Sequence, residues 1–167
     1  MKPARMLFAT VLTASALSLA ACQAEKDPAP AASSAPDAKP GLAVSDARLV
    51  LPAVSGNPGA AYFTLANQGS GTAALAAVSI DGAAKAEMHQ TQGNAMTPVD
   101  RVDVAPGTSI SFEPGKMHVM AFELDPKLKA GSSTEMTLTF ADGDKISAQM
   151  KIEAAGAAAM GGMDMQH

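Results

Sequence analysis

The residues best suited to chemistry in this chain are three histidines, each with a methionine next to it or two positions away. They occur in the segments Met88-His89, Met117-His118-Val119-Met120 and Met165-Gln166-His167. Imidazole nitrogen and thioether sulfur are both uncharged donors. Thioethers select soft Cu(I), whereas calcium, magnesium and manganese prefer oxygen ligands. Copper is therefore the metal that this pattern favours.

The N-terminus predicts export and lipid attachment. Lys2 and Arg5 precede an apolar stretch, Met6 to Ala21, which is too short to span a membrane and is typical of a secretory signal. The segment Leu19-Ala20-Ala21-Cys22 resembles the lipobox of bacterial lipoproteins, where the signal is cut before a cysteine that carries lipid. The alternative is an ordinary signal with a chance cysteine. We expect a lipoprotein signal peptide at 1–21, lipid on Cys22, and anchorage in the bacterial cell envelope facing the periplasm.

Charge and cysteine count exclude several classes of function. Removing residues 1–21 changes the net charge from −4 to −6, which argues against nucleic acid or an anionic membrane surface as a partner. Cys22 is the only cysteine, so no disulfide can form within the chain and a CxxC reductase is excluded. A blue-copper site is excluded as well, because it needs a free thiolate.

Composition divides the mature chain into three parts. Residues 22–41 are rich in Ala, Pro, Ser, Asp and Lys and contain no aromatic residue, which predicts a disordered tether to the membrane. Residues 42–153 have the length of one domain. Residues 154–167 are mostly Ala, Gly and Met, which predicts a flexible tail.

Within residues 42–153 the hydropathy pattern has a period of two, which is typical of half-buried strands. Ile146, Met150 and Ile152 alternate with polar residues, and Asp142-Gly143 before them is a strong hairpin signal. No stretch has a convincing helical pattern. We predict an all-β, antiparallel sandwich of seven to nine short strands. The candidate strands are Val44–Leu51, Ala61–Ala66, Ala73–Ile80, Lys85–Thr91, Met96–Val104, Thr108–Phe112, Met117–Leu124, Met136–Phe140 and Ile146–Ile152.

These strands would place the candidate ligands on one face. His118 and Met120 are two residues apart, so on a strand they point the same way, about 6.6 Å apart along it. If Gly93-Asn94 forms a two-residue turn, Thr91 pairs with Met96, and His89 lies diagonally from Met96 on the same face. A three-residue loop would put those two side chains on opposite faces.

The order of these residues resembles the copper-binding motif of periplasmic copper chaperones of the PCu(A)C type. That motif is a His, ten residues, a Met, twenty-one residues and then His-x-Met. Here 21 residues separate Met96 from His118, and His118-Val119-Met120 ends the motif. Similar flanking segments cover nearly the whole domain: Ala61–Asn67, Glu87–His89, Met96–Val99 and Pro114–His118.

One departure lies between His89 and Met96, which six residues separate where the family motif has ten. This chain therefore has four residues fewer than the motif. Because four is an even number, two residues can be lost from each arm of a hairpin without turning a side chain to the other face. Met88 offers an alternative sulfur only if its strand bulges. Thr97 stands where an arginine usually follows the Met.

The resemblance implies a single cupredoxin-like domain of the Greek-key type that holds Cu(I) through His89, Met96, His118 and Met120. It implies delivery of copper to an acceptor protein, such as the dinuclear copper centre of cytochrome c oxidase or another chaperone. A role in copper homeostasis or sequestration is the alternative. Such a protein is not an enzyme, and its contact with the membrane is through the lipid anchor.

Other interpretations stay open at this point. A lone histidine is often structural and methionine often fills cores, a role that we assign to Met117, Met136 and Met150. A copper redox enzyme or electron carrier would need a site stable in two oxidation states, which the lack of thiolate disfavours. A structural lipoprotein without metal is a further alternative. The tail residues are either a second copper-binding segment, for Cu(I) or Cu(II), or an unstructured end: Met160, Met163, Met165 and His167.

Overall fold

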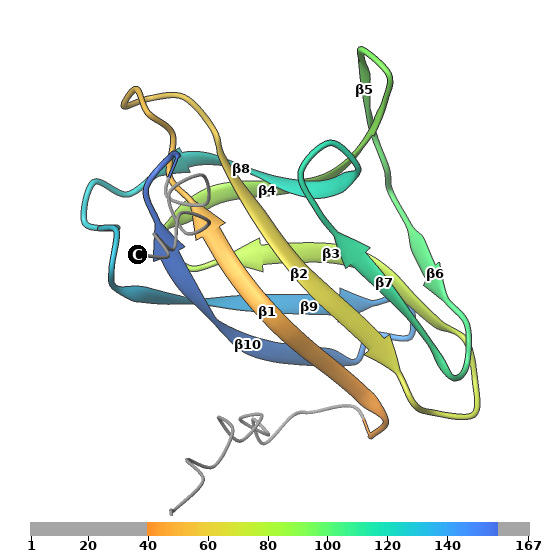
Figure 1. The fold of residues 1–167 in the computed structure, drawn as a ribbon. Coiled ribbons are helices and arrows are strands. Elements are labelled where there is room, and N and C mark those ends of the chain that lie inside the picture. The colour runs from red at the N-terminus through yellow and green to blue at the C-terminus, as the bar shows by residue number, and fades with distance from the viewer. Residues whose placement is uncertain (1–39, 157–167) are drawn as a thin grey trace, which may run out of the picture. The chain divides into compact units, whose positions relative to one another are not determined.

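A computed structural model describes residues 40–156, and within this range the chain forms ten β-strands and no helix (Figure 1). No helix that could cross a membrane is therefore found in this part of the chain. The signal peptide, Cys22, nearly all of the predicted tether and the four tail ligands lie outside the described residues. The strands are β1 (Leu42–Val50), β2 (Gly59–Asn67), β3 (Ala73–Ile80), β4 (Ala83–Gln92), β5 (Ala95–Pro98), β6 (Val102–Val104), β7 (Thr108–Phe112), β8 (Met117–Leu124), β9 (Ser133–Phe140) and β10 (Lys145–Glu153).

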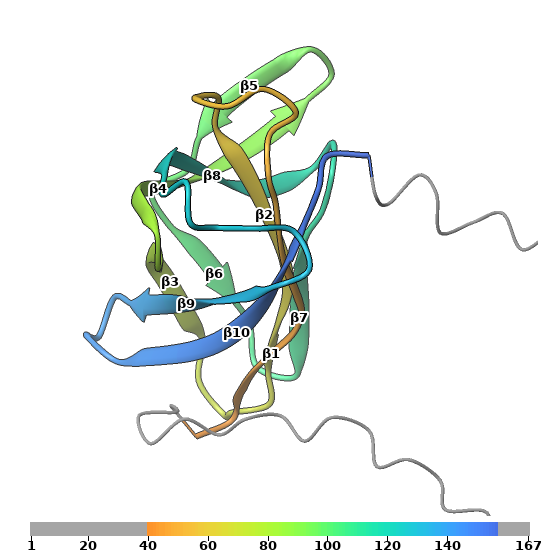
Figure 2. The same ribbon diagram turned by 90° about the vertical axis from the view of Figure 1, so that its left-hand side faces the viewer.

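The ten strands share one hydrogen-bonded sheet in the order β5-β4-β8-β2-β1-β10-β9-β3-β6, with β7 also paired to β2. One edge of β2 holds two partners in succession, because its first residues pair with β8 and its later residues with β7. The sheet curls over so that β3, β6 and β9 lie across from β1, β2 and β7 (Figure 2), and β6 contacts both β2 and β7. The result is a two-layered β-structure.

Strand direction is antiparallel in every described pair except one. β1 and β10 run parallel, with Arg48 opposite Lys151 and Val50 opposite Glu153. A parallel pair cannot be joined by a tight turn. Here the crossover between the two strands is the remainder of the domain, so the first and last strands lie side by side at its centre.

The inward faces of the strands enclose one apolar core. In β2, buried and half-buried residues alternate along the whole strand, so Ala61, Phe63 and Leu65 point inward. Phe63 stacks on Phe112 of β7 with 4.2 Å between ring centroids. Met136 and Met150 are fully buried in the same cluster, which confirms their predicted role as core residues. Each such side chain contributes roughly 1.5–3 kcal/mol when it is fully buried.

The predicted strand Met96–Val104 was wrong as a single element, because the structure divides it into β5 and β6. β5 pairs with β4, whereas β6 pairs with β3 near the other end of the strand order. The chain must leave the first pairing to reach the second, and it does so after Val99, whose N–H still donates to the carbonyl of Met88 on β4 at 2.8 Å. This break leaves β4 and β5 as a separate hairpin at the sheet edge, and that hairpin carries Met96.

Candidate metal centre

The two histidines of the domain lie on neighbouring strands and face each other. β4 and β8 pair antiparallel without a shift in register, and His89 is directly opposite His118. Directly opposed residues point to the same face of a sheet. The imidazole centroids are accordingly 6.1 Å apart, with 27° between the ring planes. His118 is buried, with 6% of its surface exposed, and the His89 side chain is 15% exposed.

Met120 lies on the same face as this histidine pair. It is two residues beyond His118 on β8 and directly opposite Glu87 of β4, so its side chain leaves the sheet on the same side as the imidazoles. Its side chain is half-buried. Met117 has the other parity and packs against the core, as predicted. β8 therefore presents His118 and Met120 on its outer face, whereas its other methionine, Met117, packs against the core.

The hairpin between β4 and β5 brings Met96 to this face. Thr91 pairs with Met96 and Gln92 with Ala95, which leaves Gly93-Asn94 as a two-residue turn. Gly93 has φ of 60°, the left-handed conformation that the first turn position of a type II′ hairpin requires. The predicted turn and pairing are confirmed, and Met96 is 52% exposed. The hairpin projects from the body of the sheet (Figure 2), so this thioether is the part of the set most open to solvent.

Met88 is not an alternative sulfur for this face. It is 5% exposed and lies opposite Val119, whose side chain is fully buried. No bulge interrupts β4 between Ala86 and Gln90, so the side chain stays in the core. Of the two sulfurs that flank His89 in the sequence, the structure presents Met96 outward and Met88 inward.

Hydrogen bonding leaves one nitrogen of each imidazole available. His118 Nδ1 lies 3.0 Å from the carbonyl oxygen of Lys116. A carbonyl only accepts, so Nδ1 carries the proton of the neutral ring and Nε2 holds a lone pair. His89 Nδ1 is buried and has no hydrogen-bond partner among residues 40–156. An unpaired buried polar atom in a native structure calls for an explanation, and a bound ion is one.

A row of charged side chains runs along β4 beside the pair. Glu87 Oε2 is 3.5 Å from His89 Nε2, and Glu87 Oε1 is 2.6 Å from the ammonium nitrogen of Lys85. The hydrogen bond from Lys85 lowers the pKa of Glu87, against the opposing effect of desolvation. The carboxylate is therefore ionised at neutral pH. Sequence reasoning missed Lys85 and Glu87, although their spacing of two and four residues from His89 places all three on one strand face.

The spacing of the imidazoles fits one ion between them. Metal–nitrogen bonds to imidazole are roughly 2.0–2.1 Å, and a ring nitrogen is about 1 Å from its centroid, so two rings that share an ion have centroids between about 5 Å apart at a tetrahedral angle and about 6 Å apart in a straight line. The observed separation is 6.1 Å. Among the described residues, no group of three or more His, Cys, Asp or Glu side chains could hold a metal. The thioethers of Met96 and Met120 are the further candidate donors that we consider at this face, and thioethers suit copper better than zinc or calcium.

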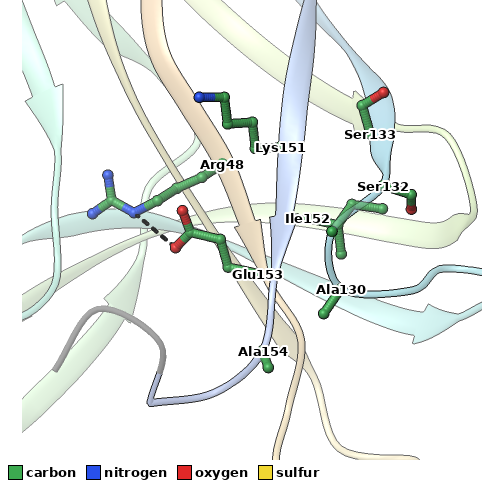
Figure 3. A pocket seen from close by; sticks show the side chains of 9 residues that line it. Arg48, Ala130, Ser132, Ser133, Lys151, Ile152, Glu153 and Ala154 are labelled. Carbon is green, nitrogen blue, oxygen red and sulfur yellow. Dashed lines mark ion pairs between the residues drawn. The ribbon is translucent and has the colours of Figure 1, made fainter. Parts of the chain in front are cut away.

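A hollow of about 800 Å³ lies near β1 and β10 (Figure 3). Its walls include Arg48, Lys151 and Glu153, and Arg48 Nε is 3.9 Å from Glu153 Oε2. Among the described residues, no histidine, cysteine or methionine lines it. The described part of this hollow offers no donors for a soft metal, so we place the candidate centre on the face of β4, β5 and β8.

Comparisons with known proteins show the family to which this chain is related. Residues 42–152 match the LpqE-like lipoprotein family. A protein of Leifsonia xyli subsp. xyli that is named as a lipoprotein is 29% identical over 147 residues, which cover 85% of this chain and 86% of that protein.

Solved structures share the fold. The copper-bound PCuAC domain from PmoF2 has a TM-score of 0.59 at 18% identity, over 68% of this chain and 93% of that domain. Cu(I)-bound DR1885 from Deinococcus radiodurans has a TM-score of 0.55 at 22% identity, over 73% of this chain and 81% of that protein. The predicted all-β sandwich of the PCu(A)C type is confirmed by these likenesses.

Proposed function

This chain belongs to the LpqE-like lipoprotein family, and from that premise we propose that it is a Cu(I)-binding metallochaperone of the bacterial cell envelope. Its ligands are His89, Met96, His118 and Met120. Its task is to carry copper to an acceptor protein, for which the dinuclear copper centre of cytochrome c oxidase is our first candidate.

The observation that carries this proposal is the pair of opposed histidines, which shares its face of the sheet with two methionines. His89 and His118 are opposed across β4 and β8, Met120 follows on β8, and Met96 stands diagonally across the β4–β5 hairpin. Two imidazoles and two thioethers form a soft, neutral donor set that favours Cu(I). Two proteins that share this fold hold copper, PmoF2 through its PCuAC domain and DR1885 as Cu(I), which supports the same cargo here.

The donor set favours transport over catalysis or electron transfer. Without a thiolate, the ion is held by neutral donors only and can be displaced by a stronger set in an acceptor. Met96 is half exposed, so an acceptor can reach the ion from the hairpin side. An electron carrier needs a site that suits two oxidation states, and thioethers favour the reduced ion.

The proposed location of the protein in the cell envelope depends on the N-terminal segments of the chain. Residues 1–21 direct export, lipid on Cys22 anchors the protein to the membrane, and residues 22–41 tether the domain 42–153 on the periplasmic side. In the tail 154–167, Met160, Met163, Met165 and His167 form a second copper-binding segment, for Cu(I) or Cu(II).

Metal transfer tests the proposed function directly. The Cu(I)-loaded protein is mixed with the apo dinuclear copper domain of cytochrome c oxidase, and the copper content of each is measured after separation. Movement of copper to the oxidase domain is the expected result, and His118→Ala should abolish loading and transfer together. Retention of copper would favour a role in sequestration instead, and failure of the wild-type protein to bind Cu(I) would refute both.

A further inference from the structure

The outer face of β4 carries three linked side chains that end at the candidate centre. Lys85, Glu87 and His89 occupy alternate positions, so they point the same way. The ammonium of Lys85 holds one carboxylate oxygen of Glu87 at 2.6 Å, and the other oxygen is 3.5 Å from His89 Nε2. Lys85 is itself placed over the ring of Phe122, 5.9 Å from its centroid. The carboxylate is thus held from one side and faces the imidazole on the other.

This arrangement selects one form of the His89 ring. An ionised carboxylate only accepts hydrogen bonds, so the nitrogen that faces it must carry the proton of the neutral imidazole. That nitrogen is Nε2, and the lone pair is then on Nδ1. Nδ1 is the buried ring atom that has no hydrogen-bond partner in the part of the chain that the structure describes.

His118 is fixed in the opposite form. Its Nδ1 donates to the carbonyl of Lys116, so its lone pair is on Nε2. The two opposed rings therefore differ in which nitrogen is free. A carboxylate or carbonyl that orients a ligating histidine in this way is a common device in metal sites, and it raises the basicity of the ligand.

Resting on the proposed function, we infer that Glu87 is a positioning residue: it holds His89 so that Nδ1 faces the copper, while His118 offers Nε2. If Glu87 served only as a surface partner of Lys85, its second oxygen would have no need to face the imidazole. The unpaired Nδ1 would also remain without a role. The positioning role accounts for both observations.

The test compares Glu87→Gln with a matched control. Arg101 and Asp103 form another ion pair two residues apart, 2.7 Å between Nε and Oδ1, on a different part of the sheet. Asp103→Asn therefore removes a similar carboxylate charge away from the centre. Histidine tautomers are read in the apo proteins by long-range ¹H–¹⁵N correlation NMR, and Cu(I) affinity is measured by competition with a chromophoric chelator.

In the wild-type apo protein we expect the Nε2–H form for His89 and the Nδ1–H form for His118. Glu87→Gln should give a mixture of His89 forms and a Cu(I) affinity lower by roughly 10–100-fold, the usual cost of losing such a partner. Asp103→Asn should change neither reading, and thermal unfolding of both variants shows whether the domain stays folded.

An Nδ1–H form of His89 in the wild-type protein would overturn the inference, and so would a Glu87→Gln variant with unchanged tautomers and affinity. The NMR measurement needs no copper. A protein that shows the expected tautomers but binds no Cu(I) would refute the proposed function and leave the orientation of His89 by Glu87 in place.

Discussion

Replacing Met120 by leucine removes a sulfur while nearly keeping the volume of the side chain. Met120 is half-buried on the outer face of β8, so the change leaves the core intact. Exchanges between methionine and leucine usually cost less than about 1.5 kcal/mol. For a domain of this size the unfolding midpoint should fall by at most about 10 °C, and the variant should remain folded at room temperature.

The expected loss of copper affinity is larger than this loss of stability. On the outer face of the described hairpin and β8, the sulfurs are Met96 and Met120, and only Met120 is held by a strand paired on both sides. Loss of a residue that merely orients a metal ligand costs 10–100-fold in affinity, so loss of the ligand itself should reach at least about 100-fold, or ~2.7 kcal/mol.

Competition with a chromophoric Cu(I) chelator measures this affinity. Met117→Leu is the matched control, because Met117 is on the same strand but packs against the core. We expect the control to bind Cu(I) like the wild-type protein. Equal affinities for Met120→Leu and the wild type, or a large loss in Met117→Leu alone, would show that the assigned face of β8 is wrong.

Three further outcomes are expected. One alanine inserted between Ala95 and Met96 should turn the thioether to the other face and weaken Cu(I) binding, and a second alanine between Thr91 and Gln92 should restore the pairing and the affinity. Asn67→Ala should lower the free energy of unfolding by about 1–3 kcal/mol, seen by chemical denaturation, because it leaves the carbonyls of Gly71 and Val104 without their donor; Cu(I) affinity should not change. Deletion of residues 157–167 should reduce the copper bound per chain while the domain site keeps its affinity, and equal stoichiometry by metal analysis would exclude the tail as a second site.

Strand positions were predictable because most strands here are half-buried. A period of two in hydropathy marks such strands directly, and β3, β7 and β8 have the predicted bounds. The hairpin turn at Gly93-Asn94 was also predictable, since few residue pairs adopt a two-residue turn so readily. The division between β5 and β6 was not, because it depends on which distant strand each half pairs with.

The candidate ligands were predictable for a different reason. Spacing within a strand fixes the face of a side chain, so His118 and Met120 could be placed together from the sequence alone. The register between β4 and β8 could not be deduced in that way, and it is this register that sets His89 opposite His118. The contact of Glu87 with His89 was missed because it depends on side-chain conformation and on the ion pair that Lys85 forms with Glu87.

A copper carrier must hold its ion tightly and yet release it to an acceptor. Under the proposed function, different strands of this domain carry the ligands for these two steps. The imidazoles are held between β4 and β8, and both are largely buried, so they resist exchange. Met96 is on an edge strand that pairs with β4 alone, and half of its surface is open. An acceptor that offers a stronger donor can replace this thioether first, while the histidines and Met120 keep the ion bound. Because the shared ion then passes through a bound intermediate instead of free solution, the exposed hairpin sets the direction from which the acceptor must approach.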